Sequence, residues 1–553
     1  MRQLSGLDAQ FLHVESRTTV GHVGGLILLD PAAVHGGALT LDDVRDVLEP
    51  RLHLAEPLRQ RLVTVPFGLG LPYWFDDPDF DIEFHLREVA LPGPGDDRQL
   101  GEQVARIHAR PLDRTRPLWE LYLVHGIDGG RQAIYAKIHH AAIDGVSGTE
   151  ILNTILDVTP EPRIVEPPDE LWQPEPLPSQ LELAGRGLAA SAAQPLDILR
   201  TLPRALPHVA DLPGASRVPG IQAVSDFADA AVRTATSGSA RDGERRMLTT
   251  PPTPLNAPIT AHRRFAYGSL PLVDVKKIRQ AFGLSVNDVV MVLATAALRR
   301  WLLDHDGLPD EPVVVAVPVS VRGAGSGSGG NEISVMLAEL ATQIADPIER
   351  LEAVQLALAE ARRQFNGVPA TILQDISAVI PMALSGLAAR AVFRMVTMGS
   401  FPFNLFVSNV PGPQLPLYVA GARVTGVYPA SAITDMTGAL NITLFSYDGS
   451  LDFGLIACRE LVPDVWNLIG YLRDALDELL ALAQAHPPGA AEPAHPVSAA
   501  SAAASVVGVS SAKKTATKKA AAKRTPTKRT AAKKAAPSPT PAKRAPSQDG
   551  PAD

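Results

Sequence analysis

The feature that most constrains this chain is a predicted strand, turn and helix that carry two adjacent histidines. The apolar residues 133–136 predict a strand, and the apolar spacing of residues 146–152 predicts a helix. His139 and His140 stand between them, where the strand ends. Neighbouring side chains at a strand end point to opposite sides, so only one of the two rings can face a given cavity. The sequence therefore predicts a rigid strand end that presents one histidine to a substrate.

Three interpretations of the histidine pair are open on the motif alone. Both rings can be ordinary buried histidines, a common environment for this residue. A metal site is the second interpretation, but adjacent ligands diverge, and Gly145 weakens any helix that places His140 and Asp144 one turn apart. The third makes His140 a general base, with Asp144 fixing the turn, because the pKa of imidazole lies near neutral pH.

The length of the chain indicates more than one domain. With 553 residues, 46% of them hydrophobic and 20% charged, the composition is that of a globular protein of two to three domains. A mixed α/β lobe is predicted for residues 1–160 and a second α/β lobe for residues 263–486. The prolines of residues 161–262 predict a crossover linker with helical pieces. Two lobes joined in this way can leave a cleft between them.

The chain ends in a basic segment that contrasts with an acidic body. Residues 497–553 hold twelve Lys and Arg against two Asp, a net charge of +10, which leaves −18 on the rest. Residues 487–553 contain too few apolar residues to offset the entropy of ordering, so we expect a disordered tail. A solvated tail without a fixed partner, contact with anionic lipid and non-specific contact with nucleic acid are all open.

Several other chemistries are disfavoured by the sequence. The single cysteine, Cys458, lies in an apolar run, which indicates a buried structural thiol and excludes an intramolecular disulfide. A Gly-x-Ser-x-Gly sequence is absent, which argues against a serine nucleophile and an acyl-enzyme. The sequence shows no secretory signal and no uncharged apolar run of about 18 residues. We therefore expect a protein that is soluble or lies on a membrane surface.

The motif His-His-x-x-x-Asp-Gly is similar to the signature of the CoA-dependent acyltransferase superfamily, which includes chloramphenicol acetyltransferase and peptide-synthetase condensation domains. The chain resembles one branch more closely, the bifunctional wax ester synthase/diacylglycerol acyltransferases of actinobacterial triacylglycerol synthase type. The stretches that match run in family order between about residues 4 and 480: residues 4–12, 80–85, 111–114, 117–120, 287–288 and 408–413.

This resemblance implies a fold of two chloramphenicol-acetyltransferase-like lobes with mixed sheets and a cleft or tunnel between them. It implies transfer of a fatty acyl group from acyl-CoA to diacylglycerol or a long-chain alcohol, with no bound cofactor or metal. His140 would take the proton of the alcohol, His139 would face the protein and brace the loop, and Asp144 and Gly145 would set the turn. We expect a cytoplasmic enzyme at the inner membrane face or at lipid droplets, with residues 376–389 and the basic tail as candidate lipid contacts.

Two motifs and two rival functions complete the interpretation. Asn287 opens a buried helix, and we predict that its side chain caps the free amides of the first turn, with substrate contact as the alternative. Trp119 is predicted to pack in the core beside the histidine strand. The rival functions are a condensation-type acyltransferase on another acceptor and a non-catalytic lipid- or nucleoid-binding protein. Residues 117–119 and 287–288 argue against the first of these.

Overall fold

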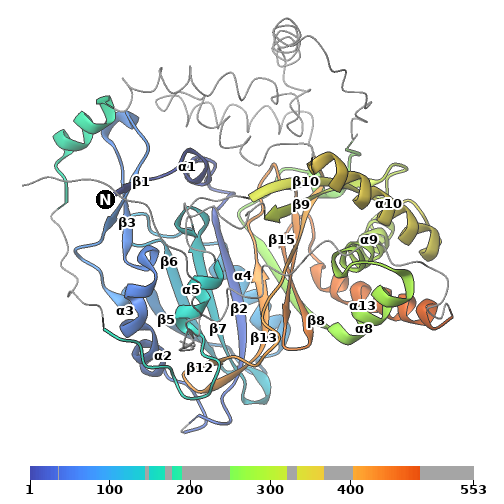
Figure 1. Cartoon of the computed structure of the whole chain (residues 1–553), viewed down its shortest axis with the longest axis horizontal. Helices are drawn as coiled ribbons and strands as arrows, with labels where there is room; N and C mark the ends of the chain where they lie inside the picture. Colours follow the sequence, from blue (N-terminus) through green and yellow to red (C-terminus); the bar gives the residue numbers. More distant parts are fainter. Residues whose placement is uncertain are drawn as a thin grey trace, which may run out of the picture. The chain divides into compact units, whose positions relative to one another are not determined.

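Two six-stranded mixed sheets dominate the computed structural model, which describes residues 1–34, 36–143, 148–167, 177–189, 250–320, 333–366 and 403–485 (Figure 1). Within these residues the first sheet has the order β12-β13-β2-β7-β6-β5, and the second has the order β10-β9-β11-β14-β15-β8. Both sheets belong to one compact unit, Met1–Val506. The predicted mixed α/β fold with two lobes is confirmed.

The strands of the three sheets are defined as follows. The first sheet contains β2 (His22–Asp30), β5 (Leu86–Ala90), β6 (Trp119–His125), β7 (Gln132–His139), β12 (Tyr418–Val419) and β13 (Ala422–Ala430). The second contains β8 (Arg263–Pro271), β9 (Val313–Ser320), β10 (Ile333–Leu340), β11 (Leu405–Val410), β14 (Leu440–Tyr447) and β15 (Ser450–Cys458). A three-stranded sheet is formed by β1 (Arg2–Gln3), β4 (Tyr73–Asp76) and β3 (Gln60–Val63).

The hairpin of β6 and β7 carries the histidine pair to one end of the first sheet. The two strands are antiparallel, with Trp119 opposite Ile138. Trp119 is buried, and its indole N–H donates to the carbonyl of Leu58 at 2.8 Å, which confirms its place in the core. On the outer face the sheet packs against α2 (Leu41–Leu48), which begins at Thr40 with a capping box.

Strand β13 comes from the second half of the chain but completes the sheet of the first half. It runs antiparallel to β2, with Val427 opposite Ile27, and a bulge interrupts the register between Val424 and Gly426. The sequence does not reveal this strand, because the bulge breaks the alternation that marks a strand. The lobe boundaries drawn from the sequence stay predictions. Most of the predicted linker and all of the basic tail lie outside the described residues.

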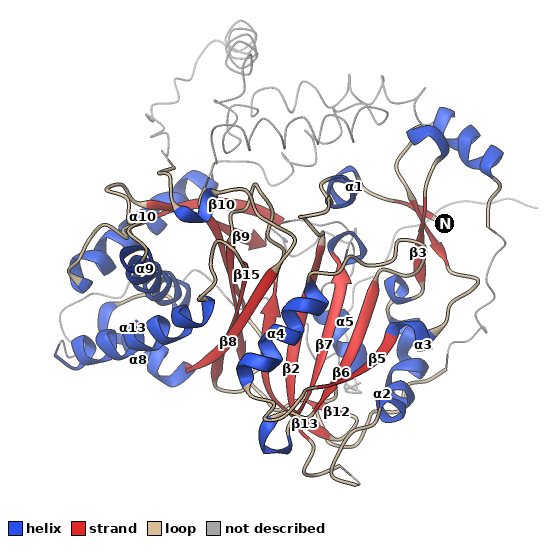
Figure 2. Cartoon of the chain, turned by 180° about the vertical axis from the view of Figure 1, so that it is seen from behind, coloured by secondary structure: helices blue, strands red, loops and turns tan. Residues whose placement is uncertain are grey.

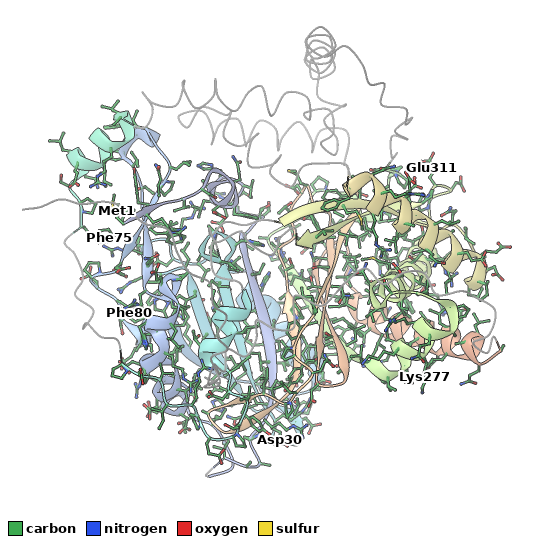
Figure 3. The ribbon with its side chains drawn as sticks, in the orientation of Figure 1. Met1, Asp30, Phe75, Phe80, Lys277 and Glu311 are labelled. Atoms are coloured by element: carbon green, nitrogen blue, oxygen red, sulfur yellow. The ribbon has the colours of Figure 1, made fainter. Side chains whose placement is uncertain are left out.

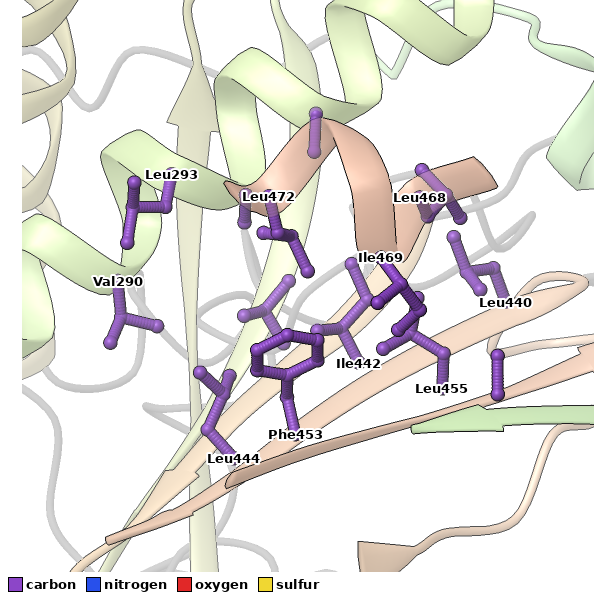
Figure 4. Packing of buried hydrophobic residues seen from close by; sticks show 14 of the residues in the cluster. Val290, Leu293, Leu440, Ile442, Leu444, Phe453, Leu455, Leu468, Ile469 and Leu472 are labelled. Atoms are coloured by element: carbon purple, nitrogen blue, oxygen red, sulfur yellow. The ribbon is translucent and has the colours of Figure 1, made fainter. Parts of the chain in front are cut away.

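The second sheet is covered by helices α8 (Leu272–Phe282), α9 (Val286–Asp304) and α13 (Val465–Ala485), and α10 (Pro347–Asn366) packs against β10. Figure 4 shows Val290 and Leu293 of α9 and Leu472 of α13 above Phe453 of β15. Among the described residues, no single helix is long and apolar enough to cross a bilayer. In the part of the chain that the structure describes, α8 and α9 taken together are long and apolar enough to span a bilayer, but the pair is bent by 100° at the break between them.

Helix α4 (Asp97–His108) lies between the two large sheets (Figure 2). Its residues Leu100 and Val104 share one core cluster with Tyr135 of β7 and Phe265 of β8. A Cβ at Gly101 would lie 2.5 Å from the carbonyl oxygen of Phe265, so only glycine permits this approach of helix to strand. The two lobes therefore share a continuous apolar core instead of meeting at a separate interface.

A buried carboxylate connects β13 to the second sheet. Asp452 on β15 is fully buried and accepts hydrogen bonds from the Val427 amide at 2.8 Å, the Ser269 hydroxyl at 2.7 Å and the Ser450 hydroxyl at 2.6 Å. Burial raises the pKa of Asp452, while these three donors act in the opposite direction. Asp452 thus holds a strand of one sheet against two strands of the other.

Replacing Asp452 with Ala should lower the free energy of unfolding by about 1–3 kcal/mol, because the buried Val427 amide loses its acceptor. Asp452→Asn should cost less, since its amide oxygen can still accept from Val427 while its NH₂ donates to a serine hydroxyl. Denaturant titration followed by circular dichroism measures both effects. The exposed Asp46 on α2 supplies the control Asp46→Asn. Equal stability of Asp452→Ala and wild type would contradict the assignment.

Candidate active site

The site is built where β7 ends at His139 and a short 3-10 turn, η5 (His140–Ile143), carries the chain off the sheet. Helix α1 (Gly6–His13) packs against this turn. The helix begins at Ser5, whose hydroxyl accepts the amide of Asp8 at 3.1 Å. Asp144 and Gly145, which are predicted to set the turn, lie outside the described residues.

His140 is half-buried and is held by its backbone and by its ring. Its amide donates to the carbonyl of Gly21 at 2.9 Å, and its ring stacks on Phe11 with centroids 4.3 Å apart and planes 5° from parallel. Its Nδ1 has no hydrogen-bond partner among the described residues. Burial and the neighbouring His139 lower the pKa of His140 to about 4. At neutral pH the ring is therefore uncharged, so one of its two nitrogens is unprotonated.

His139 occupies the opposite environment, because its side chain is fully buried. Its Nδ1 accepts the amide of Ala141 at 3.1 Å, and its Nε2 lies 3.2 Å from Oε1 of Glu15. Since an amide N–H only donates, Nδ1 must be unprotonated, and the neutral ring carries its hydrogen on Nε2, which faces the carboxylate. The two histidines thus differ in burial, as adjacent residues at a strand end should: the His139 side chain is enclosed, with Nε2 near the Glu15 carboxylate, and the His140 ring is half-buried.

Glu15 is the residue of this site that sequence reasoning missed. Its Oε1 accepts the amide of Gly21 at 2.7 Å, and its Oε2 accepts Nε of Arg114 at 3.1 Å. Burial alone would raise the pKa of Glu15, but the hydrogen bonds from His139, Arg114 and Gly21 outweigh it and lower the pKa to about 2. An isolated acidic residue far from the histidines in sequence gives no local signal. The one available hint was Arg114, which lies in a stretch that matches the family.

The predicted capping role of Asn287 is wrong. Helix α9 begins at Ser285, whose hydroxyl accepts the amide of Asp288 at 3.1 Å, while the Asp288 carboxylate accepts the amide of Ser285 at 3.0 Å. This capping box needs the serine and an acceptor three residues later, so it places the cap two residues before Asn287. The Asp288 carboxylate also pairs with Arg362 of α10. Asn287 is half-buried in the first turn, and its predicted alternative, contact with substrate, stays a prediction.

Two further predictions concern metal and thiol chemistry. In the part of the chain that the structure describes, no group of three or more His, Cys, Asp or Glu side chains is arranged to hold a metal ion. Cys458 is buried at the end of β15, as predicted, and its sulfur lies 3.4 Å from the amide of Thr260. A structural thiol is consistent with this environment.

The fold is similar to that of a wax ester synthase/diacylglycerol acyltransferase from Marinobacter aquaeolei VT8. The two chains are 30% identical, with a TM-score of 0.58 over 87% of this chain and 100% of the other. The architecture and the histidine turn thus place the protein among two-lobed acyltransferases.

Sequence comparison identifies the family. Two proteins of Mycobacterium tuberculosis, both named as candidate diacylglycerol O-acyltransferases, are 33% and 35% identical to this chain, covering 88% and 86% of it and 92% and 99% of their own lengths. Residues 4–290 match the wax ester synthase/diacylglycerol acyltransferase catalytic domain, and residues 329–480 match the C-terminal domain of the same family. The chain belongs to the wax ester synthase/diacylglycerol acyltransferase family and is an acyltransferase, as the resemblance predicted.

The lowered pKa of His140 predicts how activity depends on pH. A group whose folded pKa is about 4 stays neutral as pH falls from 8 to 5, so kcat/KM for acyl transfer should show no acid limb from His140 in that range. A histidine with an unshifted pKa would instead make kcat/KM fall as the pH drops below about 6.5. Initial rates from pH 5 to 8, with circular dichroism to verify folding at each pH, make the measurement. A fall in kcat/KM centred near 6.5 in folded protein would contradict the prediction.

Proposed function

We propose that this enzyme transfers a fatty acyl group from acyl-CoA to the hydroxyl of diacylglycerol, and also to long-chain alcohols, with His140 as the general base. The observation that carries the proposal is the uncharged, half-buried ring of His140, which stacks on Phe11 at the end of β7. The relatives support the two acceptors, since the mycobacterial proteins are named for diacylglycerol and the Marinobacter enzyme also for wax esters.

In the proposed reaction, His140 removes the proton from the acceptor hydroxyl as its oxygen attacks the thioester carbonyl. The new C–O bond forms, the C–S bond breaks, and His140 returns the proton to the departing thiolate of CoA. The products are an ester and free CoA, so proton and charge balance without a bound cofactor or metal. An alcohol is a poor nucleophile unaided, and a positioned base typically contributes about 10²–10⁴-fold to the rate.

The surroundings of His140 fit this task. A ring stacked on Phe11 and tied through its amide to Gly21 has few orientations, which favours a fixed approach of the alcohol. We further propose that Asp144 and Gly145 set the turn after His140, and that a tunnel between the lobes excludes water from the thioester. A base with a pKa of about 4 is weak, so its contribution depends on position more than on basicity.

Replacement of His140 tests the proposed chemistry. His140→Ala should lower kcat for transfer from palmitoyl-CoA to dioleoylglycerol by about 10²–10⁴-fold, because the group proposed to remove the hydroxyl proton is lost. The same loss is expected with hexadecanol, since the base serves both acceptors. Purified full-length protein is assayed by chromatographic detection of the labelled ester in mixed micelles.

His53, a half-buried histidine of the same lobe, supplies the matched control His53→Ala, which should retain wild-type turnover. Unchanged turnover of His140→Ala would refute the base assignment. Failure of the wild type to acylate either acceptor would refute the proposed substrates.

We also propose that the enzyme works at a lipid surface, the inner membrane face or a lipid droplet, because diacylglycerol resides there. An exposed apolar patch in the first lobe supports this. Phe67 is 94% exposed and has a φ of 58°, a strained conformation for a non-glycine residue. It lies in the turn between β3 and β4 of the three-stranded sheet; Figure 3 labels Phe75 of β4.

The helix of residues 180–189, drawn in teal in Figure 1, packs against the same turn. A Cβ at Gly187 would lie 2.7 Å from a Val65 methyl, which shows how closely helix and turn approach. On the outward stripe of this helix, Leu181 and Leu188 are 84% and 58% exposed. We use the name apolar patch for these exposed side chains, Phe67 on the turn and Leu181 and Leu188 on the helix. Residues 376–389 and the basic tail, the lipid contacts predicted from sequence, lie outside the described residues; for the tail we propose non-specific contact with anionic lipid or nucleic acid.

Polar substitution of the apolar patch should weaken binding to lipid. Phe67→Ser with Leu181→Ser should reduce cosedimentation with vesicles of phosphatidylcholine and dioleoylglycerol, because two large apolar side chains no longer enter the bilayer surface. These vesicles carry no net charge, so the basic tail adds little. Leu356→Ser, which replaces a 71% exposed leucine of α10, is the matched control. Equal binding of the double variant and the control would refute the proposal that the apolar patch contacts lipid.

A further inference from the structure

We propose that Glu15 is a positioning residue for the reaction, because one oxygen of its carboxylate contacts the two groups that accept the backbone amides of His140 and Ala141. The inference rests on the proposed role of His140 as the base. Glu15 itself does not contact the free Nδ1 of His140; it acts through Gly21 and His139. Two separate chains of contacts lead from the carboxylate to the turn: one consists of hydrogen bonds, and the other begins with a close contact to the His139 ring.

The first chain runs through the backbone of Gly21. Oε1 of Glu15 accepts the amide of Gly21 at 2.7 Å, and the carbonyl of the same residue accepts the amide of His140 at 2.9 Å. Gly21 is thus held at both of its polar groups, and its carbonyl fixes the backbone of the base. A shift of the carboxylate would move the acceptor on which the His140 amide depends.

The second chain runs through the ring of His139. The same Oε1 lies 3.2 Å from Nε2 of His139, and Nδ1 of that ring accepts the amide of Ala141 at 3.1 Å. The Ala141 amide requires an unprotonated Nδ1, so the neutral ring carries its hydrogen on Nε2, the nitrogen that faces the carboxylate. Ala141 follows His140 directly, so the two chains hold the residue itself and the residue after it.

The second carboxylate oxygen is used to hold Glu15 in place. Arg114 donates to Oε2 through its guanidinium and also donates to the carbonyl of Leu12 at 2.7 Å, at the end of α1. All four contacts to the carboxylate are with donors, so an ionised group is required. A glutamine would present an NH₂ group either to Arg114 or to the Nε2–H of His139, which places donor against donor.

The packing around Gly21 shows that the atoms of this arrangement have little room to move. A Cβ at Gly21 would lie 2.7 Å from Nε2 of His139 and 2.8 Å from the carbonyl oxygen of Phe11, the residue on which His140 stacks. A glycine is therefore needed where the carboxylate, the His139 ring and α1 converge. Small displacements in this packing are transmitted to the ring of the base.

A positioning role predicts a specific pattern of kinetics. Glu15→Gln should lower kcat about 10- to 100-fold, with the KM for palmitoyl-CoA and for dioleoylglycerol changed less than about twofold, because misplacement of the base affects the transition state more than binding. The decisive measurement is a double-mutant cycle with His140→Ala. If Glu15 acts through His140, Glu15→Gln should cause no further loss once His140 is absent.

The outcomes separate this inference from a merely structural role and from failure of the proposed function. Wild-type kcat in Glu15→Gln, or an equal fold-loss in the presence and absence of His140, overturns the positioning role. Unchanged turnover of His140→Ala refutes the base itself, whatever Glu15→Gln does. Arg114→Lys is the second variant if Glu15→Gln fails to fold; it keeps the charge, and its smaller kcat loss should also vanish without His140. Glu83→Gln, at a 78% exposed carboxylate, is the control and should match wild type.

Discussion

The pairing of β13 with β2 is the interaction on which the rest of the structure depends. It places a strand from the second half of the chain in the sheet that carries the histidines, and Asp452 holds that strand against β15. Arg263, at the start of β8, donates to the carbonyl of Thr18, in the loop between Glu15 and Gly21. The second lobe therefore contacts the segment that supports His140. Together with the apolar core that the lobes share at α4, these contacts join the two lobes into one packed structure.

The face of the first sheet next to the site is buried and polar, yet carries little net charge. Lys137, two residues before His139, is buried and pairs with Glu120 at 3.0 Å. His108 lies 2.6 Å from the hydroxyl of Tyr135, and burial lowers its pKa to about 3. Burial likewise lowers the pKa of His22 well below its ordinary value. The environment of this face thus disfavours an additional positive charge; at His140, burial and the neighbouring His139 have the same effect and keep the imidazole in its basic form.

Local patterns were readable in the sequence, and contacts between distant segments were not. The β6–β7 hairpin, the cap at Thr40 and the buried helix α9 follow from periodicity and turn residues, so they could be predicted. The entry of β13 into the first sheet depends on a partner about 400 residues away and on a bulge. Glu15 is similar, because its role exists only once folding brings it to His139. The error at Asn287 came from choosing a capping residue by its type when a serine two positions earlier completed the motif.

The topology of the first sheet has a consequence for synthesis of the chain. Without β13, strand β2 is the outer strand of its sheet, since β7 covers only its other side. The residues of β13 leave the ribosome roughly 400 residues after β2, a delay of tens of seconds at about 5–20 residues per second. During that interval the nascent N-terminal half exposes unpaired backbone groups along β2, which favours pairing with another chain. Slow translation between the two strands should therefore make the protein more dependent on chaperones.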